Sequence, residues 1–173
     1  DLVACIRDGK PYNELKQTIE FFKGEKFSAP TKPKFTHKID WKIVTDFKPG
    51  TRVAIKTKKG TVSLDLLVDE APGTVSNFLE LIKDKYYNGK NFHRIVPNFI
   101  IQGGSPGADE YVGDGPFMRD ELSRRSHTRG TVGISTRGRD TGDAQWFINL
   151  VDNPRLDHDY TIIGHITSGL DVA

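Results

Sequence analysis

The sequence predicts a mainly β protein whose strands form a closed barrel. Between residues 52 and 173, short apolar stretches are separated by turns rich in glycine and proline, which is typical of many short strands. One segment here, Thr74–Asp84, has helical spacing instead, with an apolar stripe formed by Val75, Phe78, Leu79 and Ile82. Few helices and many short strands therefore favour an all-β barrel.

The composition is that of a soluble globular protein. Hydrophobic residues make up 36% and charged residues 28% of the 173 residues, which is enough apolar material for a core. The net charge of +2 is too small to indicate a nucleic-acid-binding protein. No apolar run approaches the length of a transmembrane helix. We therefore expect neither a nucleic acid nor a membrane among its partners.

The cellular compartment stays open. A single cysteine, Cys5, excludes an internal disulfide and any zinc site built on a cysteine pair. Both a reducing cytoplasm and a periplasm are compatible with one cysteine. No basic-then-apolar leader opens the sequence, and Asp1 in the first position indicates a mature or excised fragment.

Residues 1–50 stand apart as an N-terminal extension. Pro11 suits a first helical turn, and helical spacing predicts a helix over residues 11–23, with an apolar face of Tyr12, Leu15, Ile19 and Phe22. Residues 26–38 carry two prolines and four lysines and predict an extended linker. The spacing of Trp41, Ile43 and Thr45 indicates a possible strand over residues 41–47. The extension is either an arm packed on the main domain or the tail of an upstream or partner-binding segment.

The strand predictions of the main region follow the alternation of apolar and polar residues. Residues 52–68 alternate around Lys58-Lys59-Gly60, which predicts a hairpin with glycine in its turn. Residues 92–104 predict two short strands broken at Pro97-Asn98. Further strands are expected at Arg129–Ser135, Gln145–Leu150 and Tyr160–Ile166.

Two polar residues, Arg94 and Gln102, interrupt the apolar stretch 92–104. Ile100 and Gln102 are two residues apart, so they share one face of a strand. An arginine beside Phe99 and Ile100 would give an apolar patch with fixed hydrogen-bond donors. Spacing alone leaves the alternative of an ordinary half-buried strand pair whose arginine points to water.

A resemblance to a known family favours the first interpretation, an apolar patch with fixed donors, over the ordinary strand pair. Residues 92–104 read FHRIVPNFIIQGG, residues 142–149 read GDAQWFIN, and Leu156-Asp157 follow. Together with the ending IGHITSGLDV at residues 163–172, they resemble the signatures of the cyclophilins, a family of peptidyl-prolyl cis–trans isomerases. The resemblance runs in one consistent order from about Arg52 to Ala173, and its short loops are similar to those of bacterial members.

The resemblance implies a fold and leaves one point open. It implies an eight-stranded antiparallel barrel, closed and capped by two helices, over residues 51–173. Cyclophilins usually continue to a last strand that completes the barrel, whereas this sequence stops at Ala173. Either the sequence is truncated or another segment covers the open edge, and residues 41–45 are a candidate for such a strand.

The resemblance also implies an activity that needs no cofactor, metal or nucleophile. Rotation about an Xaa-Pro bond is slow because the amide is resonance-stabilised, with a barrier of about 18–20 kcal/mol. A catalyst needs a pocket for the ring, a grip on the flanking backbone and a donor toward the prolyl nitrogen. Proline-containing polypeptides are the implied substrates, and assistance to protein folding the implied role. The alternative is a catalytically weak proline-binding docking module.

Individual residues match the family's site. Arg94 corresponds to the catalytic arginine, and the residues implied to bind substrate are Phe99, Ile100, Gln102, Ser135, Gln145, Phe147, Leu156 and Tyr160. A one-residue gap leaves Thr136 as the alternative to Ser135. Ile100 replaces the more usual methionine, and Tyr160 replaces the pocket histidine. The family often has tryptophan where Arg155 stands, so weak binding of cyclosporin is implied.

Other groups of polar residues give weaker indications of a functional site. We expect His93 to be a structural residue with satisfied ring nitrogens. Asp157-His158-Asp159 resembles a metal cluster, but adjacent residues on a turn rarely converge on one ion. Ser126-His127 could suggest a hydrolase, yet no nucleophile-elbow motif is present. The glycines of residues 103–107 lack the Gly-Lys-Ser/Thr ending of a phosphate loop.

Overall fold

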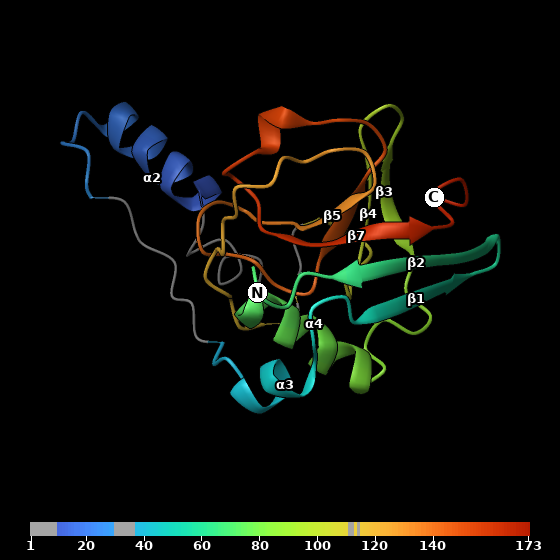
Figure 1. Ribbon diagram of the computed structural model, residues 1–173. Helices are drawn as coiled ribbons and strands as arrows, with labels where there is room; N and C mark the ends of the chain where they lie inside the picture. Colours follow the sequence, from blue (N-terminus) through green and yellow to red (C-terminus); the bar gives the residue numbers. More distant parts are fainter. Residues whose placement is uncertain (1–9, 30–36, 111–112, 114) are drawn as a thin grey trace.

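The computed structural model describes residues 10–29, 37–110, 113 and 115–173 (Figure 1). Its helices are α2 (Lys10–Lys23), α3 (Trp41–Asp46), α4 (Pro72–Lys83) and the short 3-10 helix η1 (Pro154–Leu156). Its strands are β1 (Arg52–Thr57), β2 (Gly60–Leu66), β3 (Phe92–Val96), β4 (Ile100–Gly103), β5 (Thr131–Ile134), β6 (Trp146–Asn149) and β7 (Ile162–Ser168).

All the described strands belong to one antiparallel sheet that curls around the core (Figure 1). The strand order is β1-β2-β7-β5-β6-β4-β3. The mainly β prediction is therefore confirmed. Within the described residues the sheet has seven strands, and β1 and β3 each have a strand neighbour on one side alone. The closed ring of eight strands is not seen in this part of the chain.

The first hairpin forms as its alternation predicts. Thr57 lies opposite Gly60 at the turn, and Gly60 takes a φ of +149°, which a residue with a side chain rarely adopts. Along β2 the side chains of Val62, Leu64 and Leu66 are buried while their neighbours are less so. This hairpin supplies one wall of the hydrophobic core.

Helix α4 confirms the helix predicted from the apolar stripe. Its carboxylate cap comes from far along the chain: Glu121 accepts hydrogen bonds from the main-chain N–H groups of Gly73 (3.0 Å) and Thr74 (2.7 Å). The Thr74 hydroxyl donates to the same carboxylate at 2.7 Å. A negative charge at this end also suits the helix dipole. Val75 and Phe78 then face the core.

Residues 41–47 do not form the expected strand, because Trp41–Asp46 fold as helix α3. The side chain of Asp40 accepts hydrogen bonds from the main-chain N–H groups of Lys42 (2.9 Å) and Ile43 (3.2 Å), which starts a helix. Ile43 is buried in the core cluster against α4, while Trp41 is 61% exposed. The proposal that residues 41–45 complete the barrel as a strand is therefore wrong.

The predicted N-terminal helix is present as α2, which lies to one side of the sheet in Figure 1. Gly24 follows it with a φ of +68° and ends it as predicted. Its apolar residues Leu15, Ile19 and Phe22 are exposed. Much of the predicted linker, including Pro30 and Pro33, lies outside the described residues.

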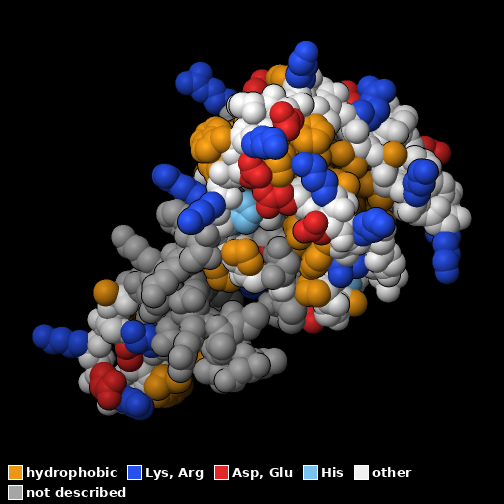
Figure 2. Space-filling view, turned by 90° about the horizontal axis from the view of Figure 1, so that it is seen from below, with side chains coloured by type: hydrophobic (Ala, Val, Ile, Leu, Met, Phe, Trp, Pro, Cys, Tyr) orange, Lys and Arg blue, Asp and Glu red, His pale blue; other side chains and the backbone are white. Residues whose placement is uncertain are grey.

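The surface carries both signs of charge. On the face shown in Figure 2, lysine and arginine side chains are interspersed with aspartate and glutamate, and small hydrophobic areas lie between them. Among the described helices, none combines the length and the apolar character that crossing a bilayer requires.

Candidate active site

The β3–β4 hairpin places Arg94 beside Gln102. The two residues lie opposite each other in the strand register, and Asn98 turns the chain between the strands with a φ of +56°. Arg94 Nη1 donates to Gln102 Oε1 at 3.3 Å, and Arg94 Nε lies 3.5 Å from a carboxylate oxygen of Glu110. The Arg94 side chain is 40% exposed, so the guanidinium is held by these two contacts and is still accessible to solvent.

A buried row of hydrogen bonds orients the amide of Gln102. Its Nε2 donates to Ser135 Oγ (3.0 Å) and to Gln145 Oε1 (2.9 Å), and both Gln102 and Gln145 are almost completely buried. With its nitrogen committed to two acceptors, Gln102 turns its oxygen toward Arg94. The structure thus joins four of the predicted site residues, and it favours Ser135 over Thr136.

Apolar site residues lie next to this row on the same face of the sheet. Gln102 of β4 lies opposite Phe147 of β6, and Ile100 lies two residues away on the same side of β4. Ile100 and Phe147 are buried, yet neither belongs to the main hydrophobic cluster between sheet and helix. They form a separate apolar surface.

Glycine and tyrosine position the ring of Phe147. A Cβ atom on Gly133, directly opposite on β5, would lie 2.6 Å from Phe147 Cζ, so the ring lies over a residue that must lack a side chain. The Tyr160 ring meets the Phe147 ring edge to face at 5.7 Å between centroids.

Phe99, in the turn before β4, and Leu156, in the 3-10 helix η1, complete the predicted set. Phe99 is half-buried just before β4, and Leu156 is half-buried at the end of η1. The guanidinium of Arg155 lies over the Phe99 ring at 4.3 Å, a cation–π contact. Arg155 therefore covers an apolar ring at the position where the family often has tryptophan.

The structure also bears on the predictions made for the other polar groups. Both ring nitrogens of His93 are buried without a hydrogen-bond partner, so the expected satisfied histidine is not observed. Ser126 Oγ donates to Asp157 at 2.7 Å rather than to His127, which gives no hydrolase pair. Asp159 instead pairs with Arg139 at 3.1 Å, so the Asp157-His158-Asp159 carboxylates diverge.

One residue of this region was missed by the sequence reasoning as a site neighbour. His127 is completely buried, and its ring stacks on Phe147 with 5.8 Å between centroids. The sequence shows a histidine before a strand, and nothing in the local pattern tells which ring it meets.

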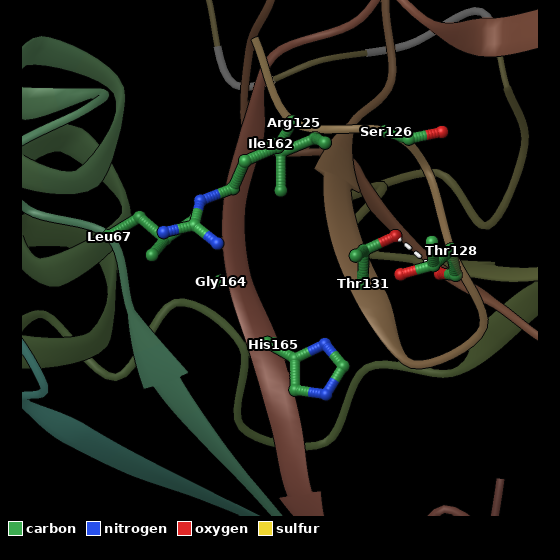
Figure 3. Close-up of a pocket in the computed structure, with 8 residues that line it drawn as sticks. All are labelled: Leu67, Arg125, Ser126, Thr128, Thr131, Ile162, Gly164 and His165. Atoms are coloured by element: carbon green, nitrogen blue, oxygen red, sulfur yellow. Dashed lines mark hydrogen bonds between the residues drawn. The ribbon is translucent and has the colours of Figure 1, made fainter. Parts of the chain in front are cut away.

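A separate hollow of about 400 Å³ lies between β5 and β7 (Figure 3). Its lining includes Arg125, Thr131 and His165, and none of the predicted site residues. Two of its donors are engaged: Arg125 binds Glu70, and Thr131 donates to the carbonyl of Thr128. This hollow is not the predicted site.

The curled antiparallel sheet, with an arginine–glutamine pair beside a buried phenylalanine, fits the cyclophilin class that the sequence motifs resemble. The family model described as cyclophilin type peptidyl-prolyl cis-trans isomerase/CLD matches residues 52–173. The chain belongs to this family and is a cyclophilin-type peptidyl-prolyl cis–trans isomerase.

Two curated bacterial relatives are also described as peptidyl-prolyl cis-trans isomerases. The chain is 43% identical over 122 residues to a peptidyl-prolyl cis-trans isomerase of Helicobacter pylori, covering 68% of this chain and 75% of that protein. It is 37% identical over 114 residues to peptidyl-prolyl cis-trans isomerase B of Bacillus subtilis, covering 65% and 80%.

A solved structure shows the same fold. The cyclophilin type peptidyl-prolyl cis-trans isomerase of Cryptosporidium parvum superposes with a TM-score of 0.68 at 29% identity, covering 70% of this chain and 80% of that chain. A second structure of that protein was determined in the presence of the dipeptide Ala-Pro.

Proposed function

We propose that Arg94 is the catalytic residue of this isomerase and that it acts on Xaa-Pro bonds in exposed or unfolded polypeptides. The observation that carries the proposal is the hydrogen bond between Arg94 and an immobilised Gln102, beside the apolar surface of Ile100 and Phe147. Proline rings are apolar, and the bond that rotates sits at the edge of the ring. An arginine at the border of an apolar surface meets both needs.

The chemistry requires a donor that is in place before the bond twists. As the C–N bond loses its double-bond character, the prolyl nitrogen gains a lone pair that an N–H group can stabilise. The guanidinium of Arg94 is always charged, and the contacts to Gln102 and Glu110 leave further N–H groups for this task. Because the donor is preorganised, it stabilises the twisted state more than the planar ground states.

The substrate backbone binds at Gln102 in this proposal. Both amide hydrogens of Gln102 are engaged, by Ser135 and by Gln145. A substrate carbonyl therefore replaces Ser135 Oγ as acceptor, and Gln145 keeps the amide oriented. The rings of Phe99, Phe147 and Tyr160, with Ile100 and Leu156, form the apolar surroundings of the proline.

An Arg94→Ala variant tests the catalytic assignment. A charge-assisted hydrogen bond contributes about 1.5–3 kcal/mol, so kcat/KM in a protease-coupled proline-peptide assay should fall roughly 10- to 100-fold. Arg129 is an exposed arginine two residues before β5, and Arg129→Ala is the matched control that should retain wild-type activity. Equal rates for wild type and Arg94→Ala would contradict the catalytic assignment of Arg94. Rates no faster than the uncatalysed reaction, with peptide binding retained, would instead support a proline-binding docking module.

We also propose that cyclosporin binds weakly, because Arg155 rather than tryptophan lies over Phe99. A charged guanidinium offers a smaller apolar surface than an indole to an apolar cyclic peptide. Arg155→Trp should tighten cyclosporin binding, measured by calorimetry, by at least tenfold, about the effect of one additional buried aromatic contact. An unchanged Kd would contradict this role of Arg155.

For the organisation of the chain, we propose an isomerase domain at residues 51–173 preceded by an extension at residues 1–50. The family match begins at residue 52, and α2 leaves Leu15, Ile19 and Phe22 exposed. Limited proteolysis should cut between α2 and α3 and leave an active core. Protection of that whole segment would argue against a separate extension.

The barrel is proposed to close through an eighth strand that pairs with the open edges of β1 and β3. The support is that these edges flank the same curled sheet. Amide hydrogen exchange on a protein extended beyond residue 173 should show added protection in β1. Unchanged protection of the β1 amides would contradict the proposal.

A further inference from the structure

A buried histidine lies directly behind the apolar part of the proposed site. The His127 ring has no exposed surface and stacks on Phe147 at 5.8 Å with 22° between the ring planes. It also meets the Tyr160 ring edge-on at 6.4 Å. A single residue outside the predicted set thus contacts two of its aromatic members.

Hydrogen bonds determine which nitrogen of His127 carries the proton. Nε2 lies 3.2 Å from the main-chain oxygen of Tyr160, and a carbonyl can only accept, so Nε2 is the donor. Nδ1 lies 3.1 Å from Asn149 Nδ2 and therefore accepts. The ring is neutral, with its hydrogen on Nε2.

The orientation of Asn149 is itself determined by its neighbours. Its Nδ2 also donates to Thr131 Oγ1 at 2.8 Å, and its Oδ1 accepts from Asn153 Nδ2 at 2.7 Å. Turning the amide to offer oxygen to the histidine would set nitrogen against nitrogen at Asn153. Asn149 also lies opposite Ile100 in the sheet, so the network adjoins a third member of the proposed site.

We propose that His127 is a positioning residue for the isomerase reaction: its neutral ring holds Phe147 and Tyr160 in place, and protonation of that ring lowers turnover. The proposal rests on the proposed role of these aromatic residues. A protonated ring carries a hydrogen on Nδ1 that points at the Asn149 amide hydrogens, so the ring or the amide has to move. Either movement disturbs the stack on Phe147 and the link to the Tyr160 main chain.

The charged and titratable surroundings fit this behaviour. Burial lowers the pKa of His127, and this outweighs the Tyr160 carbonyl and the Asp157 carboxylate, which both favour the charged form. Asp157 binds the main-chain N–H of His127 at 2.7 Å rather than the ring. From β5 and β6 the network presents Thr131, Asn149 and Phe147, which are uncharged. The phenol ring of Tyr160 also lies against the His127 ring.

The first test is a pH profile of kcat/KM with a proline peptide that has no ionisable side chain, measured by NMR exchange from about pH 8 to about pH 5. Wild type should lose activity several-fold on the acid side. His127→Gln removes the titrating ring, so its kcat/KM should be roughly tenfold lower at neutral pH, the effect of one lost hydrogen bond, and nearly independent of pH. A wild-type rate and profile in His127→Gln would overturn the proposal.

Two controls separate positioning from stability. Val62→Ala lowers stability at a fully buried site on β2 far along the sheet order from β6, and it should keep both the rate and the pH profile. The second control is an NMR titration of wild type that needs no variant. The ring signals of Tyr160 and Phe147 should shift with the same midpoint as His127.

The proposed function and the positioning role of His127 can each fail without the other. Absence of isomerase activity in wild type at neutral pH would contradict the proposed function, while the ring signals would still report whether His127 controls Phe147 and Tyr160. Ring signals that stay unchanged through the His127 titration would overturn the positioning role even in an active enzyme.

Discussion

At the scale of single residues, the site depends on side chains with no freedom to reorient. The side-chain nitrogen of Gln102 donates to two acceptors, so its side-chain oxygen is the atom that faces Arg94. Phe147 lies against a glycine, Gly133, and meets the Tyr160 ring edge to face. Preorganisation of this kind is what a reaction without covalent chemistry needs, because the catalyst has only positions and charges to offer.

Gly133 provides a direct test of that preorganisation. Gly133→Ala places a methyl group within 2.6 Å of Phe147 Cζ and should push the ring out of position. We expect a several-fold loss in kcat/KM together with about 1–3 kcal/mol of stability, measured by proline-peptide assay and urea unfolding. Val132→Ala, which alters the opposite face of β5, should lose stability while keeping kcat/KM. Full activity in Gly133→Ala would contradict the assigned place of Phe147.

The sequence named the residues of the proposed site but not those that support them. Arg94 and Gln102 were named from the family resemblance, and the structure places them opposite each other on one hairpin. His127 could not be named from the sequence, because its contacts to Phe147 and Tyr160 join segments about 20 and 33 residues away, and no local period reports such contacts.

At the scale of elements, α4 and β2 follow their periodicity, whereas α3 does not. Trp41, Ile43 and Thr45 alternate as in a strand, but the cap at Asp40 and a single buried residue, Ile43, produce a helix. A segment this short has too few residues for its apolar period to determine the secondary structure. Here the capping side chain and the contact with α4 determine that it is a helix.

Ile43 should therefore anchor α3 to the domain. Ile43→Ala removes a side chain that is 6% exposed and packed in the core cluster, and we expect a loss of about 2 kcal/mol or more in the free energy of unfolding. Trp41→Ala, at 61% exposure on the same helix, is the matched control and should change it by about 0.5 kcal/mol or less. Urea unfolding compares the two. Equal effects would show that α3 is not held by this contact.

At the scale of the whole molecule, two titratable groups with lowered pKa values, His127 and Asp157, make the fold sensitive to acid. The pKa of His127 is lowered by burial, so its unfolded form binds a proton first as pH falls. The pKa of Asp157 is also lowered: burial acts in the opposite sense, but hydrogen bonds from His127 and Ser126 together prevail. Both groups therefore stabilise the fold above their unfolded pKa values, and both contributions are lost as pH falls toward the folded ones.

Two variants should separate these contributions. Between about pH 6.5 and about pH 5, stability should fall less steeply in His127→Gln than in wild type. Below about pH 4, Asp157→Asn should flatten the curve instead. Urea midpoints measured at each pH provide the comparison, with Asp171→Asn as an exposed control. Identical slopes in all four proteins would rule out these two groups as the source.

The sequence by itself determined the family, the hairpin β1–β2 and helix α4, and it named the residues of the proposed site, because each is encoded in motifs or in periods that span a few turns or strands. Only the tertiary structure decided that residues 41–46 form a helix, that Glu121 caps α4, and that His127 lies behind Phe147. These features depend on which distant surfaces meet, and burial against a partner outweighs local preference whenever the segment is short or the contact spans loops.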